Sequence, residues 1–327
     1  MKELNLLLLA PHWRVSLIRS FQTAKVRLRV AGKLVGADSD PLSPSLKVVD
    51  VEYPLPLFAD AACKQALLDI CERETIHTIL PMTNKAVEFL NRHCQDFKRE
   101  NILAYLQDAD TIEVCHDKLK LSKFFNAEKI LSPLTGEVGL FINSSEFPLI
   151  AKPRQGEGGK DNFVIENQRD LKFYAEKYPG HIMQKYIEGQ EFTVDWFSDK
   201  SGKPLLIVPR ERLAVQGGEV MVSRICMDPE IIAAVRQVGL LLKLKGPANL
   251  QGIRPANGKL LFTDINLRFG SGAGHTIAAG GDMPGCIYRD LGDEGPLAEI
   301  NSIQDGSVMT RFHDAFFSHT GLDEEQR

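Results

Sequence analysis

The chain of 327 residues lacks an excess of charge of either sign, because 39 Lys and Arg stand against 43 Asp and Glu. This near-neutral balance argues against a polybasic surface for nucleic acid, and 43% apolar residues argue against a disordered composition. We therefore expect small molecules, and no nucleic acid, as partners. A chain of this length is expected to form roughly two or three structural units.

Long hydrophobic runs are also missing. The apolar run Leu4 to Ala10 leads into Pro11 without a small-residue cleavage site, so we interpret it as a buried first strand and not as a signal peptide. No other run approaches the ~18 apolar residues that a membrane span requires. We expect a cytoplasmic protein with no membrane partner, and the sequence leaves a homodimer open.

Cysteine pairs of the kind that bind zinc are absent. The six cysteines are scattered without a C-x-x-C pair, and no histidine cluster completes a ligand set. We interpret them as reduced thiols that serve as small core residues. They are Cys63, Cys71, Cys94, Cys115, Cys226 and Cys286.

Residues 1–110 alternate apolar runs with amphipathic stretches, which predicts a Rossmann-like parallel sheet covered by helices. The turn Pro11 to Arg14 lacks G-x-G-x-x-G, so dinucleotide binding there is unsupported. The expected strands are Leu4 to Ala10, Arg27 to Gly36, Lys47 to Val51 and Ile79 to Pro81, and the expected helices are Val15 to Lys25 and Ala59 to Glu74.

We expect two further α+β units, at residues 111–186 and 187–327. Asn167 is a predicted cap for a helix over Gln168 to Tyr178, and Asp228 with Pro229 predicts a helix that runs to about Lys245. From residue 205 onward the pattern otherwise predicts mostly strands.

Asn257-Gly258 lies between two strand-like runs and is the strongest short signal for a hairpin. A two-residue turn pairs residues whose numbers sum to 515. Gln251 then lies opposite Asp264, Asn249 lies opposite Asn266, and Arg268 follows on the same face.

These polar side chains would make a costly core but a suitable clamp for Mg²⁺, which prefers carboxylate or amide oxygens plus substrate phosphates. Arg268 would face the transferring phosphate. The alternative is a solvated outer face of an edge hairpin.

Lys152 ends an apolar strand, and a loop with Gly156, Gly158 and Gly159 follows. Glycines let backbone N–H groups turn toward an anion, so lysine and loop together suit nucleotide phosphates. A plain surface turn is the alternative. The loop does not match G-x-x-x-x-G-K-[ST], which excludes a P-loop.

The segment Gln184 to Glu191 predicts a strand, a tight turn and another strand. Adenine could bind its backbone near Lys185 and Ile187, and Glu191 could accept hydrogen bonds from ribose. By itself the segment favours an ordinary hairpin over a nucleotide contact. Farther on, the glycine-rich run Gly270 to His275 can turn N–H groups toward a carboxylate, and we expect His275 to be structural.

Taken in order, several blocks resemble the ATP-grasp superfamily, in its carbamoyl-phosphate-synthetase-like branch. Leu267 and Asp264 depart from the family pattern, which commonly has proline and glutamate there. The matching blocks are Asp117-Lys118, Pro148 to Pro153 with Gln155 to Lys160, Gln184 to Asp195, Pro209 to Arg212, Gly217 to Glu219, Asn249 to Gln251 and Asp264 to Arg268.

The resemblance implies an enzyme that uses ATP and Mg²⁺, with one or two ions and Mn²⁺ as an alternative, to phosphorylate a carboxylate and couple it to an amine. By resemblance, Arg268 and Arg210 are catalytic and hold the γ-phosphate and the acyl phosphate or carboxylate. The implied nucleotide contacts are Lys118, Lys152, Gly156, Gly158, Gly159, Gln184, Lys185, Ile187 and Glu191, and the implied metal ligands are Gln251, Asp264 and Asn266.

Three other functions stay open on the sequence. The same pocket could serve a carboxylase or kinase, or it could bind ATP without turnover. A nicotinamide-dependent oxidoreductase built on the N-terminal sheet is the third.

Overall fold

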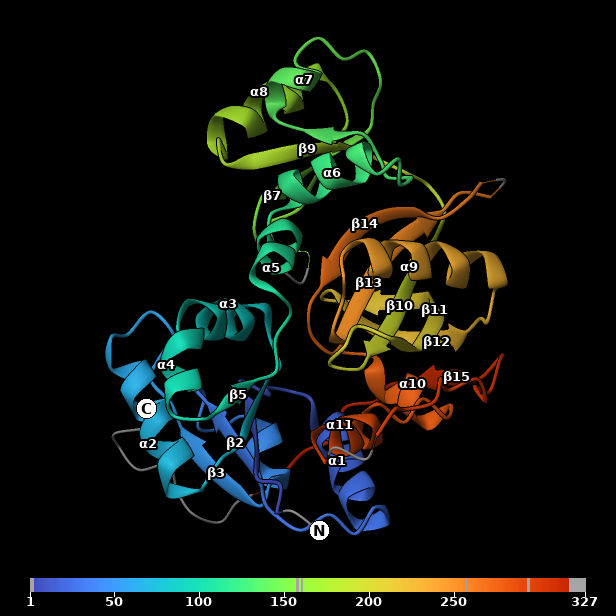
Figure 1. Cartoon of the computed structure of the whole chain (residues 1–327). Coiled ribbons are helices and arrows are strands. Elements are labelled where there is room, and N and C mark those ends of the chain that lie inside the picture. The colour runs from blue at the N-terminus through green and yellow to red at the C-terminus, as the bar shows by residue number, and fades with distance from the viewer. Residues whose placement is uncertain (1–2, 157–158, 160, 257, 293–294, 318–327) are drawn as a thin grey trace.

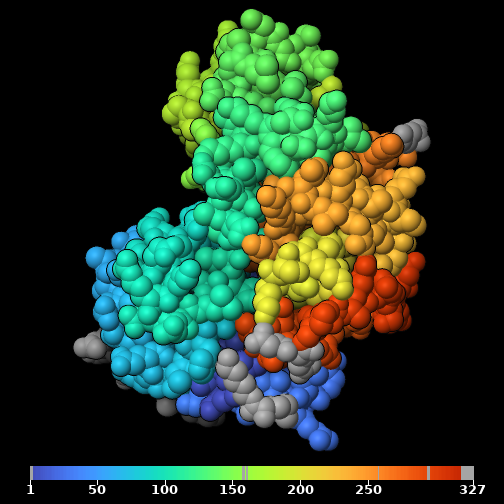
Figure 2. All heavy atoms as spheres, viewed as in Figure 1, coloured from blue at the N-terminus to red at the C-terminus, as the bar shows by residue number. Residues whose placement is uncertain are grey.

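The computed structural model describes residues 3–156, 159, 161–256, 258–292 and 295–317. These residues form a mixed α/β structure with three sheets, and the small-sheet region stands apart from the rest (Figure 1). The space-filling view shows the same region as a separate lobe (Figure 2).

The N-terminal sheet is wholly parallel, with strand order β3-β2-β1-β4-β5, which confirms the parallel sheet expected from the alternating pattern. Leu6 and Leu8 of the central strand belong to one core and Leu7 and Leu9 to another, so this strand is buried on both faces. The strands are β1 Leu6–Leu9, β2 Leu34–Asp38, β3 Val51–Pro54, β4 Thr78–Pro81 and β5 Leu103–Ala104.

Helices from distant parts of the chain cover the two faces of this sheet. The Leu7 face packs on α2 Ala62–Arg73, α3 Asn84–Arg92 and α4 Cys94–Arg99. The Leu6 face packs on α1 Val15–Arg27 and on α11 Met283–Leu291. Phe21 of α1 packs edge-on against Tyr288 of α11, with ring centroids 6.0 Å apart. It also packs edge-on against Phe269, with ring centroids 5.8 Å apart.

Two predicted strands of this region were wrong in their bounds. Residues 47–48 end the 3-10 helix η1 Pro44–Val48, because Pro44 sits at its first turn and Leu46 is buried against the sheet. The run from Arg27 to Gly36 begins as the last turn of α1, and β2 starts only at Leu34.

The small sheet is antiparallel, with order β6-β9-β7-β8 and a separate core that includes Leu149, Met183 and Leu171. Asn167 caps the following helix by accepting from the N–H groups of Arg169 and Asp170, as predicted. The elements are α5 Ala109–His116, α6 Lys118–Ala127, β6 Thr135–Gly136, α7 Val138–Phe141, β7 Leu149–Pro153, β8 Phe163–Ile165, α8 Gln168–Lys177 and β9 His181–Lys185.

The large sheet is antiparallel, with order β14-β13-β10-β11-β12-β15. Asp228 and Pro229 begin α9 as predicted, although the helix ends at Leu241 and not near Lys245. The elements are β10 Gln190–Ser198, β11 Pro204–Gln216, β12 Glu219–Ile225, α9 Pro229–Leu241, β13 Gly246–Arg254, β14 Leu261–Asn266, α10 Ala273–Ala278 and β15 Val308–Thr310.

The β13–β14 hairpin pairs Gln251 with Asp264 and Asn249 with Asn266, as predicted. The two-residue turn behind that prediction was wrong, because β13 ends at Arg254 and β14 begins at Leu261. Nearer the turn, Gly252 lies opposite Phe262, so the register shifts by one residue at this point. The shift leaves Thr263 as the extra residue of a bulge, and the bulge restores the predicted pairing at Asp264.

Beyond residue 205 the sequence pattern missed α10, α11 and β15, and within residues 1–110 it missed α3, α4 and β5. The start of α11 does carry a local signal, because Asp282 caps it by accepting from the N–H of Gly285 and Pro284 lies in its first turn. Among the described residues, no helix combines the length and apolar character that a membrane crossing needs. All six cysteines are free thiols, and burial raises the pKa of Cys63 to about 11 and of Cys71 to about 12.

Candidate active site

One cavity of about 1800 Å³ lies where the three sheets meet. Every predicted site residue that the structure describes lines it, and Gly158 lies outside the described residues. The cavity therefore gathers Lys118, Lys152, Gly156, Gly159, Gln184, Lys185, Ile187, Glu191, Arg210, Gln251, Asp264, Asn266 and Arg268.

The predicted metal face lies on β13 and β14. Asn266 Oδ1 accepts hydrogen bonds from Asn84 Nδ2 at 2.8 Å and from Arg268 Nη2 at 3.2 Å. No group of three or more His, Cys, Asp or Glu suited to a metal occurs among the described residues. The donor set is instead one carboxylate beside two amides, which fits Mg²⁺ because this ion keeps several waters and takes few protein oxygens.

Lys152 is the last but one residue of β7, and it lines the same cavity as the metal face. Burial lowers the pKa of its ammonium group, and the nearby Asp264 carboxylate partly offsets that effect. Its Nζ donates to Gln184 Oε1 at 2.6 Å, and Gln184 in turn donates to Thr135 Oγ1 at 2.8 Å. Gln184 thus holds Lys152 in place.

The glycine loop after β7 is tied to the start of α6. Lys118 Nζ donates to the Gly156 carbonyl at 3.0 Å. Asp117 caps α6 and also forms an ion pair with Arg154 at 2.7 Å. Although burial acts to raise it, the pKa of Asp117 is lowered, chiefly by the hydrogen bond from Arg154. These contacts place both predicted phosphate lysines on the same side of the cavity.

At the predicted ribose end, Glu191 pairs with Arg212 Nη1 at 2.9 Å. The sequence reasoning did not assign a role to Arg212. Arg212 follows Arg210 by two residues along β11, so period-two alternation places both arginines on one face. That spacing was the signal that could have found it.

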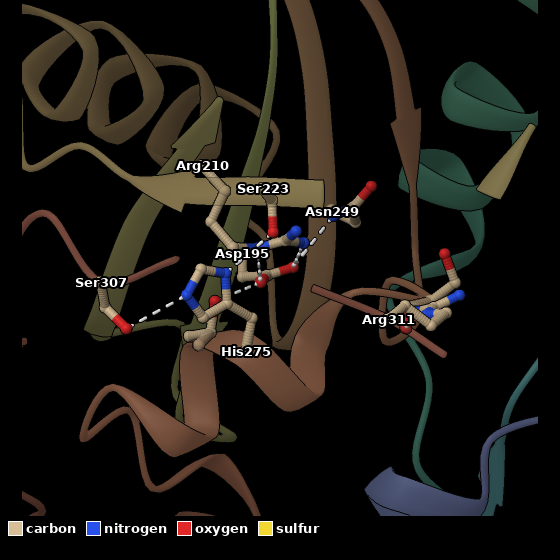
Figure 3. A network of polar contacts seen from close by, with 9 residues as sticks. Asp195, Arg210, Ser223, Asn249, His275, Ser307 and Arg311 are labelled. Carbon is tan, nitrogen blue, oxygen red and sulfur yellow. Dashed lines mark hydrogen bonds and ion pairs between the residues drawn. The ribbon is translucent and has the colours of Figure 1, made fainter. Parts of the chain in front are cut away.

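His275 is buried at the start of α10. Its Nδ1 lies 2.8 Å from Ser223 Oγ, and its Nε2 lies 3.3 Å from Ser307 Oγ (Figure 3). Burial lowers the pKa of this imidazole, and the positive charge of Arg210 lowers it further. His275 is therefore neutral near pH 7, held between two hydroxyl groups.

The family comparison settles what the fold is. A family model described as an ATP-grasp domain matches residues 115–272, and another, described as a PylC-like N-terminal domain, matches residues 6–104. Residues 115–272 form an ATP-grasp domain. The predicted fold class, a parallel N-terminal sheet followed by an ATP-grasp fold, is confirmed.

Curated relatives of the chain carry different enzyme names. A carbamoyl-phosphate synthase of Methanobrevibacter smithii is 32% identical over 88 residues, which are 26% of this chain and 24% of the synthase. A D-alanine--D-alanine ligase of Thermotoga petrophila is 24% identical over 204 residues, and the match covers 56% of this chain and 67% of that ligase. The match to the synthase thus spans about a quarter of that relative's length.

Solved structures share the fold over nearly the whole chain. The N5-carboxyaminoimidazole synthetase from Staphylococcus aureus complexed with ADP superposes with a TM-score of 0.76 at 14% identity, and the match covers 95% of this chain and 83% of that one. At this identity the likeness shows the fold alone.

Proposed function

We propose that the chain is an ATP- and Mg²⁺-dependent ligase that phosphorylates a carboxylate and couples the resulting acyl phosphate to an amine. The observation that carries this proposal is one cavity that is lined by Lys152, Asp264, Arg268 and Arg210. Within it, Asp264 lies near enough to Lys152 to influence the pKa of that ammonium group. Basic groups for phosphates and an oxygen-rich metal face thus border one space.

This chemistry requires activation, because carboxylate oxygen is a poor leaving group. The carboxylate attacks the γ-phosphorus of ATP, ADP departs, and the amine then displaces phosphate from the acyl carbon. Mg²⁺ held by Asp264, Asn266 and Gln251 would neutralise phosphate charge. The protein mainly positions the reactants and compensates charge.

The residues of the chain divide this work. Lys118 and Lys152 hold the ATP phosphates, and the backbone near Lys185 and Ile187 meets adenine. Glu191, oriented by Arg212, meets ribose. Arg268 steadies the γ-phosphate, and Arg210 holds the carboxylate and the acyl phosphate formed from it.

Water must be excluded because an acyl phosphate hydrolyses. Two loops border the cavity and could close it, namely the glycine loop after β7 and the turn Gln216 to Val220. Glu219 of that turn forms an ion pair with Arg311, so the segment after β15 is tied to the same turn.

The names of the relatives support this reaction class and also define its rival. The D-alanine--D-alanine ligases and an L-amino acid ligase from Bacillus licheniformis are ligases by name. N5-carboxyaminoimidazole synthetase and biotin carboxylase are also among the structural neighbours. One biotin carboxylase domain among them is bound to bicarbonate, so bicarbonate is the rival carboxylate-like substrate. A homodimer and a cytoplasmic location stay predictions.

A phosphate-release screen with Mg-ATP across amino acids, small organic acids and bicarbonate tests the proposal. A carboxylate should stimulate phosphate release, and adding the amine should turn the product into an amide visible by mass spectrometry. Stimulation by bicarbonate alone would assign the chain to the carboxylases. Phosphate transferred stably to an acceptor would indicate a kinase, and ATP binding without any release would indicate a non-catalytic protein.

The Asp264→Asn variant tests the metal face within the same screen. The substitution keeps the shape and removes the charge, so turnover should fall by roughly 100-fold or more. Glu211→Gln is the matched control, because Glu211 lies between Arg210 and Arg212 on β11 but does not line the cavity. Equal turnover in Asp264→Asn and wild type would reject the metal role.

A further inference from the structure

Arg210 lies in a fully buried hydrogen-bond network centred on Asp195 (Figure 3). Its Nε donates to Asp195 Oδ2 at 2.9 Å and its Nη2 to Oδ1 at 3.3 Å. Asn249, directly opposite Asp195 on the neighbouring strand, donates to Oδ1 at 3.0 Å, and Thr276 of α10 donates to Oδ2 at 2.5 Å. The four bonds occupy all the acceptor sites of the carboxylate.

Stability alone does not account for this arrangement. A buried ion pair roughly breaks even against apolar residues of similar volume, because desolvation of the two charges offsets their attraction. Moreover, Nη1 of Arg210 has no hydrogen-bond partner within the described part of the chain, and such an orphaned buried donor costs about 1–3 kcal/mol. Arg210 lines the cavity, and its unpaired Nη1 is buried beside Gly272.

Two glycines of the run after Arg268 leave room for the network. A Cβ at Gly272 would lie 2.4 Å from Arg210 Nη1, and a Cβ at Gly270 would lie 2.6 Å from Asn249 Nδ2. Gly272 has an ordinary φ of −93°, so the need for glycine is steric and not conformational. The glycine-rich run thus serves the arginine directly, whereas the sequence suggested only backbone N–H groups for an anion.

We propose that Asp195 is a positioning residue that fixes the guanidinium of Arg210, with Asn249 and Thr276 holding Asp195 and Gly272 clearing the space for Nη1. Asp195 does not touch the substrate and acts through Arg210 alone. This inference rests on the proposed function in so far as Arg210 holds the carboxylate and its acyl phosphate.

Kinetics of Asp195→Asn test the role of the network. The KM for the carboxylate should rise and its kcat/KM should fall by about 100-fold, while the KM for ATP changes by less than about threefold, because the network lies away from the predicted adenine end. Thr276→Val keeps the ion pair and removes one of the four bonds, so its loss should be smaller, near tenfold. It also keeps the inference testable if Asp195→Asn folds poorly.

A double-mutant cycle separates positioning from a structural role. In an Arg210→Gln background, Asp195→Asn should cause little further loss, because the group it positions is already gone. An equal loss in both backgrounds, or an unchanged KM for the carboxylate in well-folded Asp195→Asn, would overturn the inference.

An NMR measurement keeps the inference independent of turnover. With ¹⁵N-labelled arginine, the Nε–H signal of Arg210, identified by its loss in Arg210→Lys, should exchange with solvent at least tenfold faster in Asp195→Asn than in wild type. Equal protection in both proteins would overturn the positioning role. If the wild type releases no phosphate with any acid, the proposed function fails, and this signal still decides whether Asp195 holds Arg210.

Discussion

Asn84 Nδ2 donates a hydrogen bond to Asn266 Oδ1 over 2.8 Å and thereby joins the first turn of α3 to the predicted metal face of β14. Asn84 follows β4, at the carboxyl edge of the parallel sheet, where open α/β sheets place their ligand-binding residues. Thr83 caps α3 by accepting from the N–H of Ala86 and so fixes this turn. The N-terminal sheet region is therefore bonded directly to the predicted metal face.

Replacing Asn84 by alanine should weaken use of Mg²⁺ more than it weakens the fold. Without Asn84, Asn266 loses a donor that orients its amide, so the Mg²⁺ concentration for half-maximal activity should rise by roughly tenfold. Magnesium titrations of phosphate release measure this shift. The exposed neighbour Lys85→Ala serves as the control, and an identical magnesium curve for Asn84→Ala and wild type would contradict the contact's importance.

Replacing Lys152 by methionine should weaken ATP binding. The substitution keeps the length of the side chain but removes a desolvated charge predicted to hold phosphate, so affinity for a non-hydrolysable ATP analogue with Mg²⁺ should fall by about 10- to 100-fold. Isothermal titration calorimetry measures the change.

Lys185→Met is the matched control for that experiment. In the wild type, Lys185 Nζ forms an ion pair with the exposed Glu146 at 2.6 Å. Only the backbone near Lys185 is predicted to contact adenine. A loss in Lys185→Met as large as that in Lys152→Met would refute the proposed division of roles.

His275 should make the protein less stable in mild acid. Because burial lowers its pKa in the folded state, the unfolded chain binds a proton first as the pH falls below the ordinary histidine value of about 6.5. The stabilising contribution is full above that value and declines below it. In His275→Asn, the loss of stability between pH 7 and 5 should be shallower than in wild type, as measured by urea unfolding. A parallel pH dependence in the two proteins would reject this linkage, and His313→Asn, which replaces an exposed histidine, is the control.

Gly239 in α9 tests the packing of the large sheet. A Cβ there would lie 2.4 Å from the ring of the fully buried Trp196, so Gly239→Ala should destabilise the fold by about 1–3 kcal/mol. The helix preference for alanine, worth up to about 1 kcal/mol, does not offset this overlap.

Gly139 in α7 provides the opposite case, because a Cβ there meets nothing within 4 Å. Gly139→Ala should therefore stabilise the fold by roughly 0.5–1 kcal/mol. Urea unfolding of both variants would detect the opposite signs, and stabilisation by Gly239→Ala would show that Trp196 moves aside at little cost.

The sequence correctly predicted those elements that depend only on residues close to them in the chain. The apolar run of β1, the cap Asn167 and the pair Asp228-Pro229 act through neighbouring residues, so each was identified correctly. Helix α11 was missed although Asp282 and Pro284 mark its start, because it has only nine residues and follows Gly280-Gly281, which favour a loop. Its position depends on α1, which is remote in sequence.

The candidate site shows the same difference between local signals and contacts that are distant in sequence. The residues of the predicted metal face were paired correctly, but only because the bulge at Thr263 compensates for a turn longer than the sequence suggested. The partners that hold the site, Asn84 for Asn266 and Thr276 for Asp195, are 182 and 81 residues away from the groups they contact. No pattern of neighbouring residues encodes contacts at that separation.

The core shared by α1 and α11 has a consequence for synthesis of the chain. The Met283 and Tyr288 side chains, which complete the core around Leu6 and Leu8, leave the ribosome long after these two leucines. Until then α1 covers only part of this face of the N-terminal sheet, and the rest stays open to water and to other nascent chains. Completion of this core is therefore a late event in biogenesis, long after its central strand is made.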